Sequence, residues 1–168
     1  MDRSITLDSS DIIAKLELNP LPVEGGMYSR TYLSEFLTNG RPAGAAIYYL
    51  LRSEAFSHLH QLDVDEIYHF YLGDPVELYQ IDNDGNLTMT VLGQDITSGQ
   101  QLQALVKHGI WQGSRLVAGG KWALLGTTTT PGYLESGYTH ADREKLIKSF
   151  PQHTEIINAL TGHLLPLS

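Results

Sequence analysis

Two histidines and a glutamate form the pattern in this chain that is most suggestive of chemistry. His58 and His60 flank Leu59, and Glu66 follows after five intervening residues. Side chains alternate along a β-strand, so imidazoles at positions 58 and 60 are predicted to share one face. Imidazole nitrogens and carboxylate oxygens are ligands that divalent metal ions accept. The spacing therefore predicts a polar cluster on β-structure, with His58, His60 and Glu66 as candidate metal ligands.

The segment that starts at Glu66 is predicted to place its carboxylate beside aromatic rings. Alternation puts Glu66, Tyr68 and Phe70 on one face, and Ile67, His69 and Tyr71 on the other. A carboxylate among aromatic side chains is costly to bury unless it is paired, hydrogen-bonded or bound to a ligand. We therefore expect Glu66 and His60 to be catalytic groups of a pocket. The alternative for Glu66 is a structural ion pair with Arg30 or Arg52.

The ligand-binding candidates come from the same strand and from two other segments. Tyr68 is expected beside Glu66, whereas His69 faces away from it and has a packed histidine as its alternative. Tyr28, Arg30 and Tyr32 alternate after the pair Gly25-Gly26, and their hydroxyls and guanidinium suit a carboxylate or phosphate. An edge strand with an aromatic outer face explains these three residues equally well. The amide of Gln112 suits hydrogen bonding to a polar ligand.

The composition limits the class of protein and its partners. The 168 residues, 42% of them hydrophobic, fit one domain over residues 1–168. A formal charge of −8 predicts neither nucleic acid nor an anionic membrane as a partner. The chain has no cysteine, which excludes disulfides and thiolate ligands and agrees with a cytoplasmic protein. No signal peptide is expected at the first residues, and no apolar run reaches the roughly 20 residues of a membrane span.

The expected secondary structure is β with helices only at the ends. A capping Ser9 or Ser10 predicts a helix over 11–18, Thr139 and Asp142 predict one over 141–148, and Pro151 opens a last helix. Alternating or apolar runs predict strands over 28–32, 45–51, 57–60, 66–72, 76–81, 87–92, 102–106, 111–117 and 122–129. Many short strands between turn residues indicate a sandwich or a closed barrel.

Four motifs, in matching order, resemble one branch of the cupin superfamily. They are Pro22-Val23-Glu24-Gly25-Gly26-Met27-Tyr28, Asp65-Glu66-Ile67-Tyr68-His69-Phe70 with Gly73-Asp74-Pro75, Gly109-Ile110-Trp111-Gln112, and Thr128-Thr129-Thr130-Pro131-Gly132-Tyr133. The His-x-His pair, Glu66 and Gly73 also match the first cupin motif, with a longer spacer before Glu66. The chain departs from the branch in having Lys107-His108 where a proline is common, and Gln112 where metal-binding cupins have a histidine.

The resemblance implies an all-β double-stranded β-helix, a jelly-roll barrel, with short N- and C-terminal helices. It also implies a homodimer that holds a small polar molecule in the barrel. Sugar-nucleotide epimerases of the same superfamily make a carbohydrate- or nucleotide-like ligand and epimerase-like chemistry the leading hypothesis. The alternatives are a metal-dependent enzyme that uses His58, His60 and Glu66, and a non-catalytic dimeric binding protein. Because Gln112 replaces the imidazole, no tightly bound metal cofactor is expected.

Overall fold

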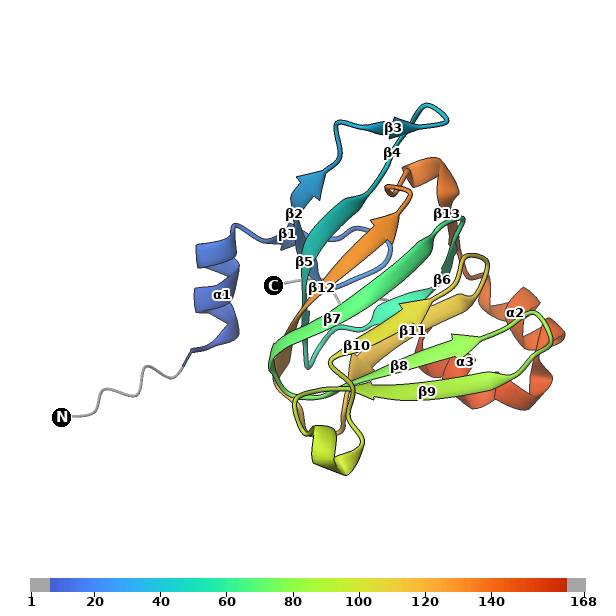
Figure 1. Cartoon of the computed structure of the whole chain (residues 1–168). Coiled ribbons are helices and arrows are strands. Elements are labelled where there is room, and N and C mark those ends of the chain that lie inside the picture. Colours follow the sequence, from blue (N-terminus) through green and yellow to red (C-terminus); the bar gives the residue numbers. More distant parts are fainter. Residues whose placement is uncertain (1–6, 163–168) are drawn as a thin grey trace.

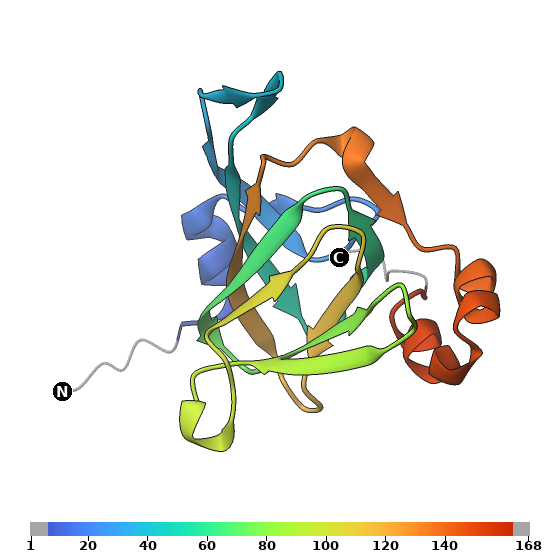
Figure 2. The ribbon, with the colours of Figure 1, turned by 45° about the vertical axis from the view of Figure 1, so that its right-hand side comes forward.

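Two antiparallel sheets make up most of the computed structural model, which describes residues 7–162 (Figures 1 and 2). The six-stranded sheet has the order β1 (Asn19–Pro20), β2 (Met27–Leu33), β5 (Ala45–Arg52), β12 (Trp122–Thr130), β7 (Asp65–Gly73) and β10 (Gln103–Val106). The five-stranded sheet has the order β13 (Tyr138–His140), β6 (Ser57–Leu62), β11 (Trp111–Leu116), β8 (Val76–Ile81) and β9 (Leu87–Leu92). A small hairpin, β3 (Leu37–Thr38) and β4 (Arg41–Pro42), projects beyond one end of the sheets.

The two sheets enclose a core that closes one half of the barrel. Strand β7 alternates as expected, since Glu66, Tyr68 and Phe70 are buried and the residues between them are more exposed. Its inward side chains pack with those of β5, β8, β11 and β12 in one cluster that includes Tyr49, Leu51, Tyr68, Phe70, Val76, Leu78, Leu116 and Leu125. The predicted all-β jelly-roll barrel is therefore confirmed, with nearly every expected strand range occupied by a strand.

Short helices cover the outer faces at both ends of the chain. Helix α1 (Ser9–Leu16) is capped by Asp8 instead of Ser9 or Ser10, because the Asp8 carboxylate accepts a hydrogen bond from the backbone N–H of Asp11 at 2.9 Å. Helix α2 (Arg143–Ser149) is capped by Asp142, so it starts two residues later than expected. Pro151 opens a 3-10 turn, η3 (Pro151–His153), before α3 (Thr154–Ala159). Two further 3-10 turns are η1 (Ile96–Ser98) and η2 (Glu135–Gly137).

The helices pack on opposite sides of the barrel (Figure 1). Ile12 and Leu18 of the α1 region contact outward side chains of the six-stranded sheet. The α2–α3 pair covers the five-stranded sheet in a cluster that contains Leu59, Ile81, Ala141, Leu146, Ile157 and Leu160. Within residues 7–162, no helix is long and apolar enough to cross a membrane.

Two β-bulges interrupt the alternation on which the site was predicted. Between β6 and β11, Gln112 is paired with His60 and Ser114 with Ser57. Strand β6 therefore contains one residue more than β11 between these two pairs. Between β2 and β5, Arg30 is paired with Ile47 and Tyr32 with Ala46, so β2 contains the extra residue here. An extra residue on one strand reverses which side chains share a face beyond that point. The two bulges therefore change which predicted residues reach the barrel interior.

Candidate functional site

A cavity of about 610 Å³ occupies the half of the barrel that the core leaves open. Its walls come from β2, β5, β6, β7 and β12, from the loop before β2, and from the segment between β12 and β13. Of the residues proposed from the sequence, Tyr28, Arg30, His60, Glu66 and Tyr68 line this cavity. Residues that are far apart in the sequence thus meet around one cavity.

Glu66 lies in the cavity wall on β7 and is bonded to Gln112 on β11. Gln112 Nε2 donates to Glu66 Oε2 at 2.9 Å, and the two side chains are 1% and 7% exposed. Burial raises the pKa of Glu66, and the nearby carboxyl of Glu24 raises it further. The proximity of His60 and the hydrogen bonds from Thr127 and Gln112 act in the opposite direction. Neither Arg30 nor Arg52 pairs with Glu66, because Arg52 bonds Glu54 and Arg30 is exposed at the mouth.

His60 is a neutral imidazole that offers a lone pair to the cavity. Its Nδ1 lies 2.7 Å from the backbone oxygen of His58, which can only accept, so Nδ1 carries the proton. Burial lowers the pKa of His60, which is 1% exposed, and the ring remains neutral at pH 7. The ring stacks on Tyr138 with 5.0 Å between centroids. Nε2 of His60 is therefore an available hydrogen-bond acceptor or proton acceptor.

Glu24 is a second carboxyl in the cavity wall, and no role was predicted for it from the sequence. It lines the cavity, is partly buried, and accepts a hydrogen bond from Ser57 Oγ at 2.9 Å. Burial raises its pKa from 4.5 to about 7, against the opposing effect of the Ser57 hydrogen bond. The Pro-x-Glu-Gly-Gly motif drew attention to this position, but the motif alone does not show where the carboxyl points.

The loop that carries Glu24 is held against β5 by a close approach of backbone. Gly26 has a φ of +75°, and a Cβ atom there would lie 2.8 Å from the Tyr49 ring and 2.9 Å from the Leu50 carbonyl oxygen. The Tyr49 hydroxyl donates to the Gly25 carbonyl at 2.9 Å. Glycine is the residue that tolerates both this backbone conformation and this contact. Gly26 therefore fixes how far Glu24 reaches into the barrel.

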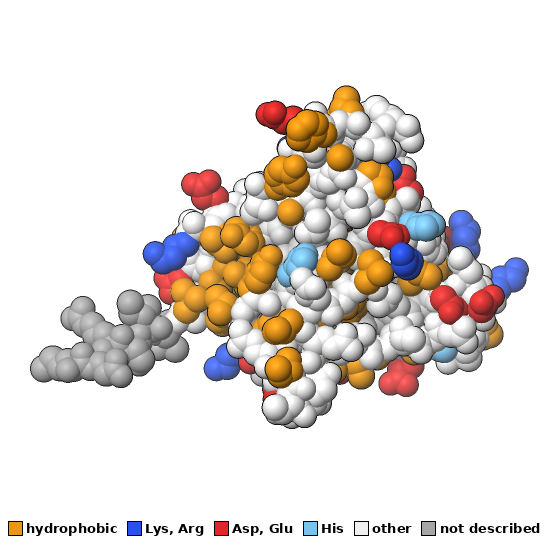
Figure 3. Space-filling model, viewed as in Figure 1, with side chains coloured by type: hydrophobic (Ala, Val, Ile, Leu, Met, Phe, Trp, Pro, Cys, Tyr) orange, Lys and Arg blue, Asp and Glu red, His pale blue; other side chains and the backbone are white. Residues whose placement is uncertain are grey.

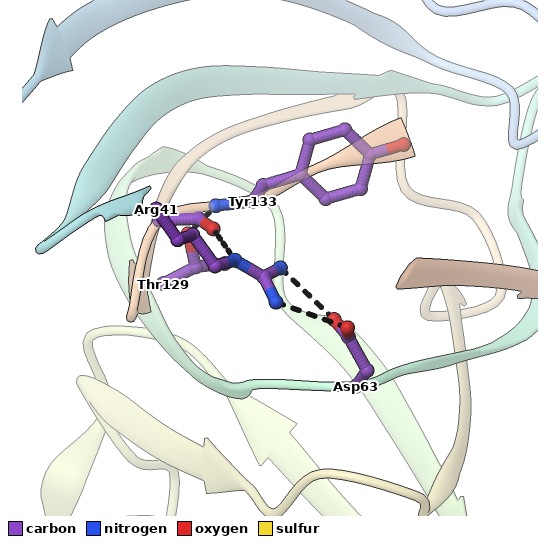
Figure 4. A network of polar contacts seen from close by, with 5 residues as sticks. Arg41, Asp63, Thr129 and Tyr133 are labelled. Carbon is purple, nitrogen blue, oxygen red and sulfur yellow. Dashed lines mark hydrogen bonds and ion pairs between the residues drawn. The ribbon is translucent and has the colours of Figure 1, made fainter. Parts of the chain in front are cut away.

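Another polar network positions the cavity wall next to Tyr133 (Figure 4). Both terminal nitrogens of Arg41 bond the Asp63 carboxylate at 2.9 Å, and Arg41 Nε donates to the carbonyl of Gly132. The backbone N–H of Tyr133 donates to Thr129 Oγ1 at 2.9 Å. These bonds tie the segment after β12 to β4 and to the turn before β7. They hold the aromatic ring of Tyr133 at the rim of the cavity.

The prediction that His58 is a metal ligand in the pocket is wrong, because a bulge in β6 turns its side chain away. Ser57, and not His58, bonds the cavity residue Glu24, while Leu59 packs toward α2 and α3. His58 falls on the extra residue and is absent from the cavity wall. Its ring stacks on His140 with 3.7 Å between centroids and on Phe56 at 6.2 Å. The two histidines are one residue apart, yet only His60 reaches the cavity.

Tyr32 and His69 also lie away from the cavity. The bulge in β2 pairs Tyr32 with Ala46, and its side chain is 54% exposed on the outside. His69 follows the regular alternation of β7 to the outer face, where it bonds Thr128 Oγ1 and Gln103 Nε2 at 3.0 Å. Figure 3 shows apolar side chains gathered on this outer face. These two residues belong to the outer surface of the six-stranded sheet.

The predicted metal ligands do not fit a metal ion. Within residues 7–162, no three His, Cys, Asp or Glu side chains are arranged to hold one. His58 is turned toward His140, and Gln112, at the position of a fourth ligand, donates its amide hydrogen to Glu66. An amide N–H directed at the carboxylate leaves that oxygen engaged as an acceptor. We therefore derive no chemistry through a metal at this site.

The sequence matches the family model described as Cupin superfamily (DUF985) over residues 10–141. The chain belongs to this family of cupins. Protein SO0799 from Shewanella oneidensis is 33% identical, with a TM-score of 0.88, over 93% of this cupin and 98% of that chain. A hypothetical protein from Leishmania major is 28% identical, with a TM-score of 0.86, over 92% and 99%.

More distant structures share the fold alone. A mutant of Bacillus subtilis oxalate decarboxylase has a TM-score of 0.57 at 14% identity, and the alignment covers 90% of this cupin and 41% of that chain. No curated protein matches the sequence. The relatives thus establish the barrel, and the chemistry of the site has to be argued from its own residues.

Proposed function

We propose that this cupin binds a small polar molecule in the barrel cavity, with Glu24, His60 and Glu66 as its polar centre. One observation carries the proposal: two carboxyl groups and a neutral imidazole, contributed by three separate segments, face the same enclosed space. Groups with perturbed pKa values that converge in a pocket mark binding or catalytic sites. Burying such groups opposes folding, so their convergence is better explained by a ligand than by stability.

The dimensions of the cavity agree with a molecule the size of a monosaccharide or nucleoside. Ligand sites commonly measure about 300–1,000 Å³, and this cavity measures about 610 Å³. Its walls combine tyrosine rings, which stack on flat apolar surfaces, with carboxyl and hydroxyl groups that bond polar substituents. These features favour a carbohydrate-like ligand.

A second candidate function, acid–base isomerisation of the bound molecule, is favoured by the presence of both Glu24 and His60 in the cavity wall. A carboxyl with a pKa of about 7 can hold or release a proton near neutral pH. The neutral His60 offers a basic nitrogen in the same cavity. A pair of titratable groups with different affinities for a proton can serve as acid and base. This arrangement is suited to epimerase-like proton transfer.

Native mass spectrometry of freshly purified protein tests the proposal. We expect a bound small molecule on the wild-type chain and its loss from Glu66→Gln, which removes the charge of the site without opening a space. The control is Glu155→Gln on the exposed side of α3, which should retain the bound molecule. Circular dichroism would establish that both variants are folded. Retention of the same molecule by a folded Glu66→Gln would contradict the proposed role of the cavity.

A further inference from the structure

We infer that the ligand of this cavity carries a protonated amino group, which Glu24 and Glu66 bind within a cage of tyrosine rings. This inference rests on the proposed function and assigns the chemical class of its ligand. It follows from the balance of charge, of hydrogen-bond donors and of aromatic surface in the cavity wall.

The charges in the cavity wall are predominantly negative. The wall contains the carboxyl groups of Glu24, Glu66 and Glu135, and its one Lys or Arg residue is Arg30, which is exposed. Among the residues that the structure describes, Glu24 and Glu66 form no ion pair. Their hydrogen-bond donors, Ser57 and Gln112, are uncharged. Buried carboxylates are normally paired with a cation, so the missing partner of these two is a positive charge on the ligand.

The polar atoms around the carboxyls also lack charged donors. His60 Nε2 is an acceptor because Nδ1 carries the ring proton. Ser57 donates one hydrogen bond to Glu24, and Gln112 and Thr127 donate to Glu66, so the carboxyl groups have only neutral donors within the protein. An ammonium group has three donors and no acceptor, which complements this set.

Tyrosine rings surround the same space. The cavity wall contains Tyr28, Tyr49, Tyr68, Tyr133 and Tyr138. The face of an aromatic ring attracts a cation, and cages of such rings recognise ammonium groups. Acidic groups and aromatic rings in one enclosed site favour a cation on two independent grounds. An anionic ligand, such as a phosphorylated nucleotide, would instead be repelled by Glu24 and Glu66.

Matched probes of different charge test this inference. Glucosamine, glucose and gluconate share a six-carbon polyhydroxyl skeleton, as butylamine, butanol and butyrate share a four-carbon one. We expect ligand-detected NMR and calorimetry to show an amine of either set binding about ten- to a hundredfold more tightly than its neutral and anionic counterparts, the range expected for hydrogen bonds to a charged group. This preference should be lost in Glu66→Gln and kept in the exposed control Glu155→Gln.

The pH dependence gives a second readout. Binding of butylamine, which stays protonated over this range, should strengthen about tenfold from about pH 6 to pH 8, because Glu24, with a pKa of about 7, changes from mostly protonated to mostly ionised. Burial lowers the pKa of His60, which favours its neutral form, and raises the pKa of the buried tyrosines, which therefore stay protonated. The titratable groups that face Glu24 are Glu66, Tyr49, Tyr68, Tyr133 and Tyr138.

The outcomes separate this inference from the proposed function. Equal or tighter binding of the neutral or anionic probe, lost in Glu66→Gln, would overturn the amine inference and leave the cavity as a binding site. If no amine binds at about 10 mM, a concentration that detects a millimolar dissociation constant, the inference is also overturned. If the molecule found by native mass spectrometry is in addition retained by Glu66→Gln, the proposed function fails with it.

Discussion

Replacing Glu24 by glutamine should stabilise this protein, and the gain should grow with pH. Glutamine has the size of glutamate and its side-chain oxygen can still accept the hydrogen bond from Ser57. The pKa of Glu24 rises from 4.5 to about 7 on burial, so the folded chain holds a proton that the unfolded chain has already released between these values. Wild-type stability therefore falls as the pH rises from about 4.5 to about 7, and the variant lacks this loss.

The size of the effect follows from the two pKa values. Their difference, at about 1.4 kcal/mol for each pH unit, corresponds to about 3 kcal/mol above pH 7. Glu24 is only partly buried, so solvent screening lowers the expected gain to between about 1.5 and 3 kcal/mol. For a chain of 168 residues this corresponds to an increase in melting temperature of about 5 to 10 °C. At about pH 4 wild type and variant should be equally stable.

Urea denaturation at about pH 4 and pH 8 measures this difference directly. Comparing Glu24→Gln with wild type at each pH cancels the titration of groups that do not interact with Glu24, and the loss of its effect on the pKa of Glu66 adds to the gain in the same direction. The exposed control Glu155→Gln should change the free energy of unfolding by less than about 0.5 kcal/mol at both values. A Glu24→Gln variant that is less stable than wild type at pH 8 would refute the reasoning, because it would show that the carboxylate is satisfied within the folded chain.

Three further predictions concern the loop, the outer surface and metals. Gly26→Ala should lower the free energy of unfolding by at least about 2 kcal/mol, because the new Cβ atom would clash with Tyr49 and the Leu50 carbonyl and because φ is positive at this position. Unchanged stability in urea would contradict this. We propose that two copies pair through the outer face of the six-stranded sheet, where Tyr71 and Leu105 are 40% and 46% exposed. Light scattering should give a dimer mass for wild type and a monomer mass for Tyr71→Glu, whereas a wild-type monomer at micromolar concentration would argue against it. Elemental analysis after dialysis should find zinc, nickel, manganese and iron well below one equivalent per chain, and a full equivalent of any of them would be inconsistent with the donor set described.

The fold could be predicted from the sequence because its signals are local. Alternation along β7 correctly placed Glu66, Tyr68 and Phe70 on the buried face. The apolar stretch of β5 and the turn residues between strands identified most of the barrel. Helix starts were displaced by two or three residues, since Asp8 and Asp142 are the caps of the first two helices and a 3-10 turn precedes the last one.

The site was only partly predictable because it depends on pairing between strands. Alternation predicted His58 beside His60 in the pocket and left Tyr32 either as a ligand-binding residue or on an aromatic outer face. A β-bulge in each strand keeps both side chains out of the cavity. A bulge is set by the partner strand as much as by the bulged one, so a single strand does not reveal it. Glu24 was missed for a similar reason, because its position depends on the contact of Gly26 with Tyr49 on a different strand.

Two carboxyl groups without a cation partner, Glu24 and Glu66, form the polar centre of the cavity. Carbon-detected NMR titration of the glutamate carboxyl groups, assigned with Glu24→Gln and Glu66→Gln, measures their pKa values individually. The structure predicts that Glu24 titrates at about 7 and that Glu66 titrates above 4.5. If Glu24 and Glu66 both titrate at or below 4.5, their charges are already compensated within the protein and the account of this cavity is wrong.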